Sequence, residues 1–438
     1  MRSPGPSDGL LLLHLSDIHF REPYCLNLET DQDQPIRQAM LNDIRVMRER
    51  LGAVSAILIS GDIAFKSNPQ EYEAAAKWLS EVTHVAGCRP DGIYTVPGNH
   101  DVDRKIAGGR MVQAVRELII RREPGPLRDK ELHDTLLHKD TALELLTPMD
   151  PYNLFAASFG CDLPPESPFW IEELPLAPGW KLIIHGLTTT LLSGPDDDVK
   201  GALYLGALQR AFAPYDGVVR LAMLHHPPEW LADHDDLDDA LWDSCALHLI
   251  GHKHRQRYRT DTRGIRLAAG SVNPSRTEGN WEPGYNLIRL QLIEEGDEYF
   301  LKTESYLRIW QSDPDRFIAK RNSKDEDVFL HKILLRCRPS LACTNAEEMN
   351  VMENNTEKQH AAGDMDASSN AVAQRNLVFD FWKLSPSQRR KIMQKLNLLE
   401  PSDDRLPETQ RYRLAFERAR NLGLIHELEE AVNQVLMK

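Results

Sequence analysis

Five short apolar runs along the chain each end in a cluster of aspartate, asparagine or histidine side chains. The runs are Leu10–Leu15, Ala56–Ser60, Gly92–Val96, Val218–Leu224 and Ala246–Ile250. The clusters that follow them are Asp17-Ile18-His19, Gly61-Asp62, Gly98-Asn99-His100-Asp101, His225-His226 and Gly251-His252-Lys253-His254. Runs of this length bounded by turn residues are typical of buried strands. In open α/β sheets the ligand crevice lies beyond the carboxyl ends of the strands, so we expect the five clusters to converge in space.

The side chains in these clusters indicate a metal site. They offer carboxylate oxygens and imidazole nitrogens, which suit Mn, Fe, Zn, Ni or Mg, whereas closed structural zinc sites usually contain cysteine. A single cluster of this kind is usually just a turn or a cap. Five of them, each directly after an apolar run, are improbable as accidents. We therefore expect a metal site, with tight turns at Gly61, Gly98 and Gly251 that let adjacent ligands point inward.

Taken together, the clusters resemble the calcineurin-like metallophosphoesterase superfamily. Its pattern of D-x-H, G-D, G-N-H-D/E, H and G-H-x-H is matched without a gap, over roughly Leu10 to Tyr306. The resemblance implies an α/β fold, a sandwich of two mixed β-sheets flanked by helices. It implies two divalent metal ions, with Mn preferred, of which one is held by Asp17, His19 and His254. The other metal is held by Asn99, His225 and His252, and Asp62 bridges both.

The same resemblance assigns roles to residues around the metals. His100 would lie beside the substrate phosphate and donate a proton or hydrogen bond to the leaving oxygen, with Asp101 orienting it from behind. The residues expected to bind the substrate are Asn99, His100 and Arg104, although a surface ion pair is the alternative role for Arg104. The expected reaction is phosphoester hydrolysis by a metal-bridging hydroxide, without a covalent enzyme intermediate.

Several neighbouring residues allow two interpretations. His225, rather than His226, matches the family ligand, because an x-Pro pair follows it. Lys253 could contact a phosphate or face solvent. Trp230 could line the pocket or be buried in the core, and the segment Gly270–Asn273 could line the cleft or form a plain turn.

The sequence favours a phosphodiesterase acting on a nucleotide or nucleic acid. The run from Val96 to Arg104 and the His-His-Pro-Pro segment are similar to the cyclic-nucleotide phosphodiesterase and repair-nuclease branches of the superfamily. Two alternatives are a signalling adaptor recruited through its tail, and a phosphomonoesterase or protein phosphatase. A catalytically dead scaffold would be expected to have lost a ligand, and none is missing. Because the formal net charge is -14, a polyanionic substrate must be met by a local basic or metal-filled cleft.

The chain divides into four segments. We expect a disordered N-terminus over 1–9, a phosphoesterase domain over 10–321 with a helical insertion at about 103–179, a flexible linker over 322–374, and a small all-helical domain over 375–438. Within the main domain, Pro35–Leu51 has helical spacing. The strand patterns at 265–269, 285–292 and 299–306 indicate an antiparallel meander that completes a second sheet.

The C-terminal segment 375–438 contains no set of residues typical of a catalytic site. Its Phe-Trp-x-Leu-Ser-x-x-Gln-Arg opening and Gly-Leu-Ile-His-Glu-Leu close loosely resemble the death-like, effector-associated adaptor domains that are fused to enzymes in bacterial defence systems. That resemblance implies a protein partner bound through 375–438, and the alternative is a helical bundle that makes the chain a homo-oligomer. Six cysteines without a C-x-x-C pair, and no apolar stretch long enough to span a membrane, predict a cytoplasmic protein with reduced thiols and no membrane contact.

Overall fold

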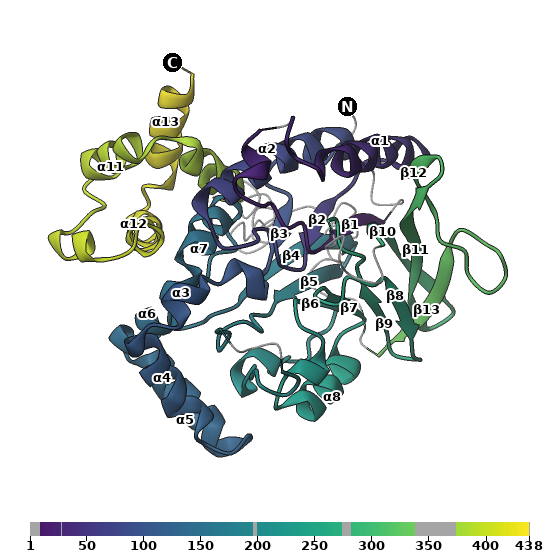
Figure 1. The fold of residues 1–438 in the computed structure, drawn as a ribbon, viewed down its shortest axis with the longest axis horizontal. Helices are drawn as coiled ribbons and strands as arrows, with labels where there is room; N and C mark the ends of the chain where they lie inside the picture. The colour runs from purple at the N-terminus through teal and green to yellow at the C-terminus, as the bar shows by residue number, and fades with distance from the viewer. Residues whose placement is uncertain are drawn as a thin grey trace, which may run out of the picture.

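Two facing mixed β-sheets form the centre of the molecule (Figure 1). The computed structural model describes residues 9–27, 29–195, 199–273, 282–336, 338 and 374–437. The first sheet runs in the order β12 (Asp315–Ala319), β11 (Glu298–Ser312), β10 (Gly284–Glu295), β1 (Leu10–Leu15), β2 (Ala56–Ile59) and β3 (Ile93–Thr95), and β13 (Phe329–Leu335) pairs with β11. The second runs in the order β4 (Trp170–Ala177), β5 (Trp180–Gly186), β6 (Val218–Leu224), β7 (Leu247–Ile250), β9 (Ile265–Ala268) and β8 (Arg257–Thr260). The fold class expected from the sequence is confirmed.

The central strands of both sheets are parallel, and this decides where the polar clusters lie. β1 pairs in parallel with β2, and β2 with β3. In the second sheet β5, β6 and β7 are likewise parallel. The loops after β1, β2 and β3 therefore leave the first sheet at one edge, and the loops after β6 and β7 leave the second sheet at a common edge. All five expected clusters lie in these loops.

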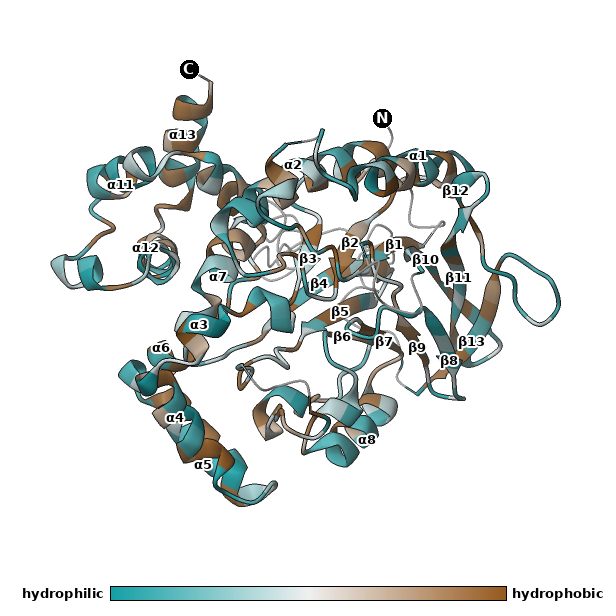
Figure 2. Ribbon diagram, viewed as in Figure 1, coloured by the Kyte–Doolittle hydropathy of each residue, from teal (hydrophilic) through white to brown (hydrophobic). Residues whose placement is uncertain are grey.

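The central strands are buried because helices cover the outer faces of the sheets and the sheets cover each other. Every residue of β2 is buried, and β1 is buried from Leu11 onward. A continuous apolar core joins the two sheets to α1 (Gln34–Leu51) and α2 (Pro69–Ala86). A second cluster packs α8 (His234–Ser244) against β6. In Figure 2 the central strands are largely brown, whereas the helices show teal on their outer sides.

The start of α2 also holds the loop that follows β2. Asn68 and Glu71 form a capping box, a pattern in which each side chain accepts a hydrogen bond from the backbone of the other. The buried Glu71 carboxylate further accepts the N–H groups of Phe65 and Lys66, at 3.1 and 2.9 Å. Because Phe65 and Lys66 come directly after the Asp62 cluster, a local helix cap fixes the path of a site loop.

The segment expected to be a helical insertion is helical only in its first part. Its helices are α3 (Arg104–Ala107), α4 (Arg110–Ile120), α5 (Pro126–Leu137), α6 (Lys139–Leu146) and α7 (Asp150–Ala156). Figure 1 shows α4 and α5 projecting away from the two sheets. Residues Trp170–Ala177 instead form β4, an edge strand antiparallel to β5. The structure differs from the expectation here because a proline-rich segment can still pair at a sheet edge, where fewer backbone donors are needed.

Two further strands differ from the sequence expectation. β13 lies inside the range 322–374 that we expected to be linker, and it extends the first sheet by pairing with β11. The expected meander is divided: β9 is parallel to β7 in the second sheet, whereas β10 and β11 belong to the first. The expected disordered residues 1–8 and most of the expected linker, residues 339–373, lie outside the described residues.

The C-terminal segment is helical, as expected, and has its own apolar core. It contains a helix over residues 374–383, then α11 (Pro386–Lys395), α12 (Glu408–Asn421) and α13 (Ile425–Leu436). Phe381, Met393 and Tyr412 are among the side chains buried in that core, which is separate from the core of the sheets. The break between α12 and α13 falls at Leu422–Leu424, where the sequence contains a glycine.

One arginine joins this helical segment to the sheets. Arg375 donates from Nε to the Asp91 carbonyl at 2.7 Å and from Nη2 to the Ile93 carbonyl at 2.6 Å. Its Nη1 also lies 2.9 Å from a carboxylate oxygen of Glu172, and its guanidinium covers the ring of Tyr94 at 4.1 Å. The helical domain therefore contacts β3 at the end opposite to the Asn99 loop.

Short 3-10 helices occur between the main elements. They are η1 (Tyr24–Leu26), η2 (Asn99–Asp101), η3 (Thr147–Met149), η4 (Ala157–Phe159), η5 (Ala207–Arg210), η6 (Pro228–Trp230) and η7 (Pro401–Arg405). Among the helices of the described residues, none combines the length and the apolar character that a membrane crossing requires.

Candidate metal centre

The loops after β1 and β2 continue side by side beyond the first sheet. The backbone N–H of Asp17 donates to the Gly61 carbonyl, and that of His19 to the Asp62 carbonyl, both at 3.0 Å. The segment 270–273 supports the same loop. Ser271 Oγ donates to the Asp17 carbonyl at 2.7 Å, and Asn273 Nδ2 to the Ile18 carbonyl at 2.6 Å. Of the two interpretations that the sequence left open for this segment, a structural turn that supports a site loop fits the contacts.

Asp17, His19 and His254 come together on one side of the site. His254 Nε2 lies 3.1 Å from Asp17 Oδ1 and 3.2 Å from His19 Nε2. His19 Nε2 lies 3.9 Å from the same Asp17 oxygen. Three donor atoms thus face one another across a space of a few ångströms, although two of their residues are separated by 235 positions in the sequence.

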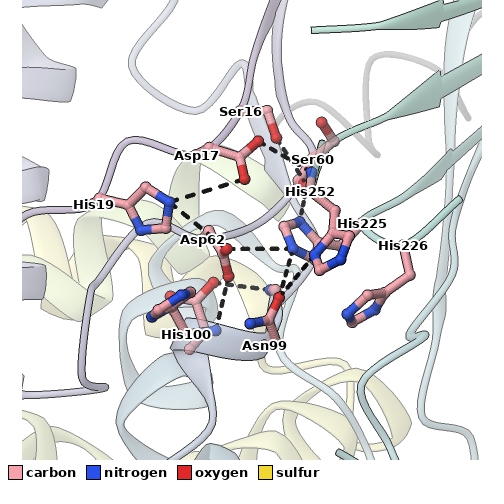
Figure 3. Close-up of polar contacts among 12 residues, drawn as sticks. Ser16, Asp17, His19, Ser60, Asp62, Asn99, His100, His225, His226 and His252 are labelled. Carbon is pink, nitrogen blue, oxygen red and sulfur yellow. Dashed lines mark hydrogen bonds and ion pairs between the residues drawn. The ribbon is translucent and has the colours of Figure 1, made fainter. Parts of the chain in front are cut away.

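Asn99, His225 and His252 form a second group beside the first. Asn99 Oδ1 lies 3.0 Å from His225 Nε2 and 3.1 Å from His252 Nδ1. The three residues come from the loops after β3, β6 and β7, so both sheets contribute. Figure 3 shows these side chains pointing toward one another.

Asp62 lies between the two groups. Its Oδ2 is 3.8 Å from His19 Nε2 in the first group and 3.3 Å from His225 Nε2 in the second. Its Oδ1 accepts the backbone N–H of His100 at 2.8 Å (Figure 3). The side chain is 1% exposed, and burial alone would raise its pKa. The neighbouring His225 and His100 hold the pKa of Asp62 well below its usual range, so the carboxylate is ionised.

The donor set fits two divalent cations. Asp17 Oδ1 is buried and accepts no hydrogen bond from any described residue, although it faces two imidazole nitrogens. His225 Nδ1 lies 2.8 Å from the Ser60 carbonyl, which must accept its hydrogen, so Nε2 is the nitrogen that would face a cation beside Asp62. Asp17, His19, Asp62 and His254 offer donor atoms within 4.8 Å of one another, and so do His225, His226 and His252, which makes two groups that could each hold an ion.

Burial keeps two of the histidines neutral. It lowers the pKa of His19 to about 3 and the pKa of His252 to about 3, so both rings offer lone pairs near neutral pH. The pKa of His225 is shifted in the opposite direction. Burial would lower its pKa, but the charge of Asp62 outweighs burial and raises the pKa to about 9. A cation bound at Nε2 would have to displace that proton.

The backbone at the site is unusual. Five of the site residues are left-handed, with φ of 53° at Asp17, 52° at His19, 55° at Asp62, 70° at His252 and 48° at His254. Residues other than glycine adopt this region rarely, at a cost of about 1–2 kcal/mol each. Such strain is typical of functional sites, where the surrounding structure enforces it.

We expected Asp101 to orient His100, but the two side chains have different partners. Asp101 is fully buried, and its carboxylate accepts the N–H groups of Gly98 at 2.9 Å and Ala64 at 3.0 Å. His100 Nδ1 instead lies 2.8 Å from the Phe65 carbonyl. Asp101 therefore fastens the loops after β2 and β3 to each other, and a backbone carbonyl orients His100.

The structure shows different surroundings for the three remaining candidate residues, Lys253, Trp230 and Arg104. Lys253 forms an ion pair with Glu229. The Trp230 ring lies edge-on to His252 at 4.7 Å, so it contacts the site and is half-buried. Arg104 is exposed at the start of α3, and its side chain makes none of the contacts found among the described site residues.

Sequence reasoning missed one residue that shapes the site, Phe65, and treated another, His226, only as the neighbour of a ligand. Phe65 holds His100 by its carbonyl, and its ring stacks on that of His100 at 4.8 Å with an angle of 17° between the planes. His226 lies at one side of the group in Figure 3, where its Nδ1 is 2.9 Å from Thr189 Oγ1. Its ring centroid is 4.5 Å from that of His252. The only available signal for Phe65 was its place three residues after Asp62.

Comparison with known proteins identifies two families in the chain. A family model described as calcineurin-like phosphoesterase matches residues 10–256, more than half of the chain. A second model, described as a GTPase-associated adaptor domain, matches residues 373–434. No match was found among curated proteins.

The search of solved structures returned remote likenesses. A single-residue variant of Vps29 from Entamoeba histolytica is 12% identical, with a TM-score of 0.27, and the match covers 75% of this chain and 100% of that one. A conserved protein from Streptococcus pneumoniae, described as a predicted phosphoesterase, is 13% identical, with a TM-score of 0.27 and coverage of 74% and 98%. GAP50 of Plasmodium is 13% identical, with a TM-score of 0.38 and coverage of 80% and 98%.

Proposed function

Because the chain belongs to the calcineurin-like phosphoesterase family, we propose that it is a phosphodiesterase with two divalent metal ions that acts on a nucleotide or nucleic acid. The observation that carries this proposal is the position of Asp62, whose Oδ2 faces an imidazole nitrogen of each donor group, at 3.8 and 3.3 Å. Two cations held there would supply Lewis acidity to the phosphoryl oxygens and lower the pKa of a water molecule at the site.

The residues of the chain would then bind and orient the phosphate. Asn99 faces His225 and His252 through Oδ1, so its Nδ2 is the group left to donate to a phosphoryl oxygen. His100 has its Nδ1 directed at the Phe65 carbonyl, which leaves Nε2 for the leaving oxygen. Stacking on Phe65 restricts the His100 ring to one orientation. Mn is our preferred metal, and the donor set is equally compatible with Fe, Zn, Ni or Mg.

The proposal is tested by a substrate panel. Full-length protein supplied with Mn²⁺ is assayed on bis-p-nitrophenyl phosphate, p-nitrophenyl phosphate, cyclic nucleotides, and single- and double-stranded DNA. We expect the highest kcat/KM on diesters. Faster hydrolysis of p-nitrophenyl phosphate than of every diester would instead support a phosphomonoesterase or protein phosphatase, and inactivity on the whole panel would exclude the enzyme.

Replacing His100 by glutamine should slow the reaction and leave metal binding intact. Loss of a proton donor to the leaving oxygen usually costs about 10²–10⁴-fold in rate. The loss should be largest for alkyl esters, whose leaving alkoxide needs a proton, and smallest for p-nitrophenyl esters. This is measured as kcat on both ester types, with His84→Gln on the exposed side of α2 as the matched control. An equal loss on both ester types would contradict a proton-donating role.

A second role, recruitment of a protein partner through residues 375–438, has its own support. The GTPase-associated adaptor domain model matches this part of the chain, and the helices there have a separate core. We propose that this segment binds a protein, in a bacterial defence or signalling system, while the site between the sheets carries out hydrolysis.

A further inference from the structure

The edge strand β8 begins directly after the His252–His254 loop and carries arginines at alternate positions. Arg257 pairs across to Ala268 and Arg259 to Arg266 on β9. Residues paired in this way share one face of the sheet. The residue between them, Tyr258, pairs with the buried Leu267 and points to the other face. Arg257, Arg259 and Arg266 therefore lie on one face of the hairpin formed by β8 and β9, which are labelled in Figure 1.

These arginines line a small hollow whose lining also includes chain neighbours of two site histidines. Arg257, Arg259 and Arg266 line it together with Gly251, Lys253, Pro227 and the acidic Glu229. Gly251 and Lys253 flank the site residue His252, and Pro227 follows His225 by two positions. The hollow measures about 40 Å³. A single water needs about 10–15 Å³ of such space, so the hollow has the scale of a phosphate group and is too small for a nucleoside.

Two of the arginines that line the hollow form no ion pair among the described residues. Lys253 is paired with Glu229, and Arg266 with Asp238. Arg257 and Arg259 have neither an acidic nor a hydrogen-bonding side-chain partner among the described residues. Charged residues on an edge strand also discourage pairing between molecules. Preventing such pairing does not require a hollow. It also does not explain why two arginines without an acidic partner line one next to chain neighbours of the site histidines, in a chain of net charge -14.

We propose that Arg257 and Arg259 bind a phosphate that flanks the one being hydrolysed, so that the substrate is an oligonucleotide. This inference rests on the proposed phosphodiesterase function and specifies its substrate class. None of the donor residues lines the hollow, so a phosphate bound there is a different one from the phosphate at Asp62. Alternate residues of a strand are about 6.6 Å apart, which lets the two guanidinium groups hold one phosphate from two sides or contact successive phosphates.

The test measures binding apart from hydrolysis. A short fluorescein-labelled phosphorothioate oligothymidylate, which resists cleavage, is titrated with full-length Mn²⁺-loaded protein and followed by fluorescence anisotropy at several salt concentrations. The variant is Arg257→Gln/Arg259→Gln. Each phosphate contact on a single strand contributes about 0.7 to the slope of log K against log salt. Loss of two contacts should lower the slope by about 1.4 and weaken binding on the order of 25-fold at about 0.1 M salt.

Arg263→Gln provides the matched control. Arg263 lies in the turn between β8 and β9 and is paired with Asp243, so this variant removes a charge from the same hairpin outside the hollow. We expect its affinity to stay near that of wild type. Melting temperature and metal content are measured for all variants, so that misfolding is not mistaken for lost binding. A parallel titration with oligouridylate shows whether DNA or RNA is preferred, and either result agrees with the proposal.

Three results would overturn the inference. They are equal affinity and salt slope in wild type and the double variant, an equal loss in Arg263→Gln, and binding of a mononucleotide diester as tight as that of the oligonucleotide. The two proposals fail separately. Hydrolysis of bis-p-nitrophenyl phosphate by wild type tests the reaction, whereas the anisotropy titration tests the arginines.

Discussion

Replacing Asp62 by asparagine should remove both bound metal and hydrolysis. The substitution keeps the size of a side chain that is 1% exposed, but it removes the negative charge between His19 and His225. An amide offers only one oxygen, and Oδ1 already accepts the His100 N–H. We expect kcat/KM on bis-p-nitrophenyl phosphate to fall at least about 10³-fold, equivalent to about 4 kcal/mol. Metal content is measured by atomic absorption after gel filtration.

The matched control for this variant is Asp43→Asn on α1. Asp43 is also a partly buried carboxylate with charged partners, because it pairs with Arg308 and accepts from Tyr285 Oη at 2.6 Å. Breaking that pair should lower the melting temperature, since an unpaired buried charge is costly. Metal content and kcat/KM should stay near wild type. If Asp62→Asn retained two metals per chain and full activity, the assignment of Asp62 as the shared ligand would be wrong.

Replacing Gly98 by alanine should be nearly as damaging, for a steric reason. An alanine Cβ would lie 2.1 Å from Asp62 Oδ1 and 2.4 Å from the Asp62 backbone nitrogen. Neither atom can move freely, because both belong to the loop that holds the shared carboxylate. Overpacking of this kind costs about 1–3 kcal/mol of stability. Displacement of a catalytic group by about 1 Å can cost 10²-fold in rate. We therefore expect at least that loss in kcat.

Gly108→Ala separates this steric effect from a general effect of alanine. Gly108 lies ten residues further along, and the nearest atom to its added Cβ is a backbone oxygen at 3.3 Å. Small shifts can relieve that contact, so activity should be close to wild type. Thermal unfolding and kcat are compared for the two variants. Full activity in Gly98→Ala would show that the loop around Asp62 can rearrange without loss of function.

The positions of the donor groups could be anticipated from the sequence because each follows a parallel strand. Asp17, Asp62 and Asn99 come after β1, β2 and β3, and their convergence follows from parallel pairing. Local apolar patterns are sufficient to find such strands. The sequence-based assignment of each residue to a particular metal remains a prediction, to be decided by the Asp62 and Gly98 variants.

Other features depend on contacts that local patterns do not record. β10 returns to the first sheet by pairing Ile288 with Leu12, a partner some 276 positions away in the sequence, so its sheet could not be inferred from alternation alone. β13 has one fully buried apolar side chain, Ile333, and the polar composition of residues 347–370 led us to assign the whole range to linker. The partner of His100 is the backbone carbonyl of Phe65, and a backbone group leaves no mark in the residue types.

The left-handed backbone at the site limits which substitutions evolution can try there. Besides glycine, the residue types that enter this region most readily are asparagine, aspartate and histidine. The five left-handed site residues, Asp17, His19, Asp62, His252 and His254, all belong to this small set. Each position is therefore selected twice, once for a donor atom and once for a backbone shape. Glutamate, which keeps the carboxylate, would meet only the first demand, so a mutational scan should find these positions intolerant even of chemically conservative exchange.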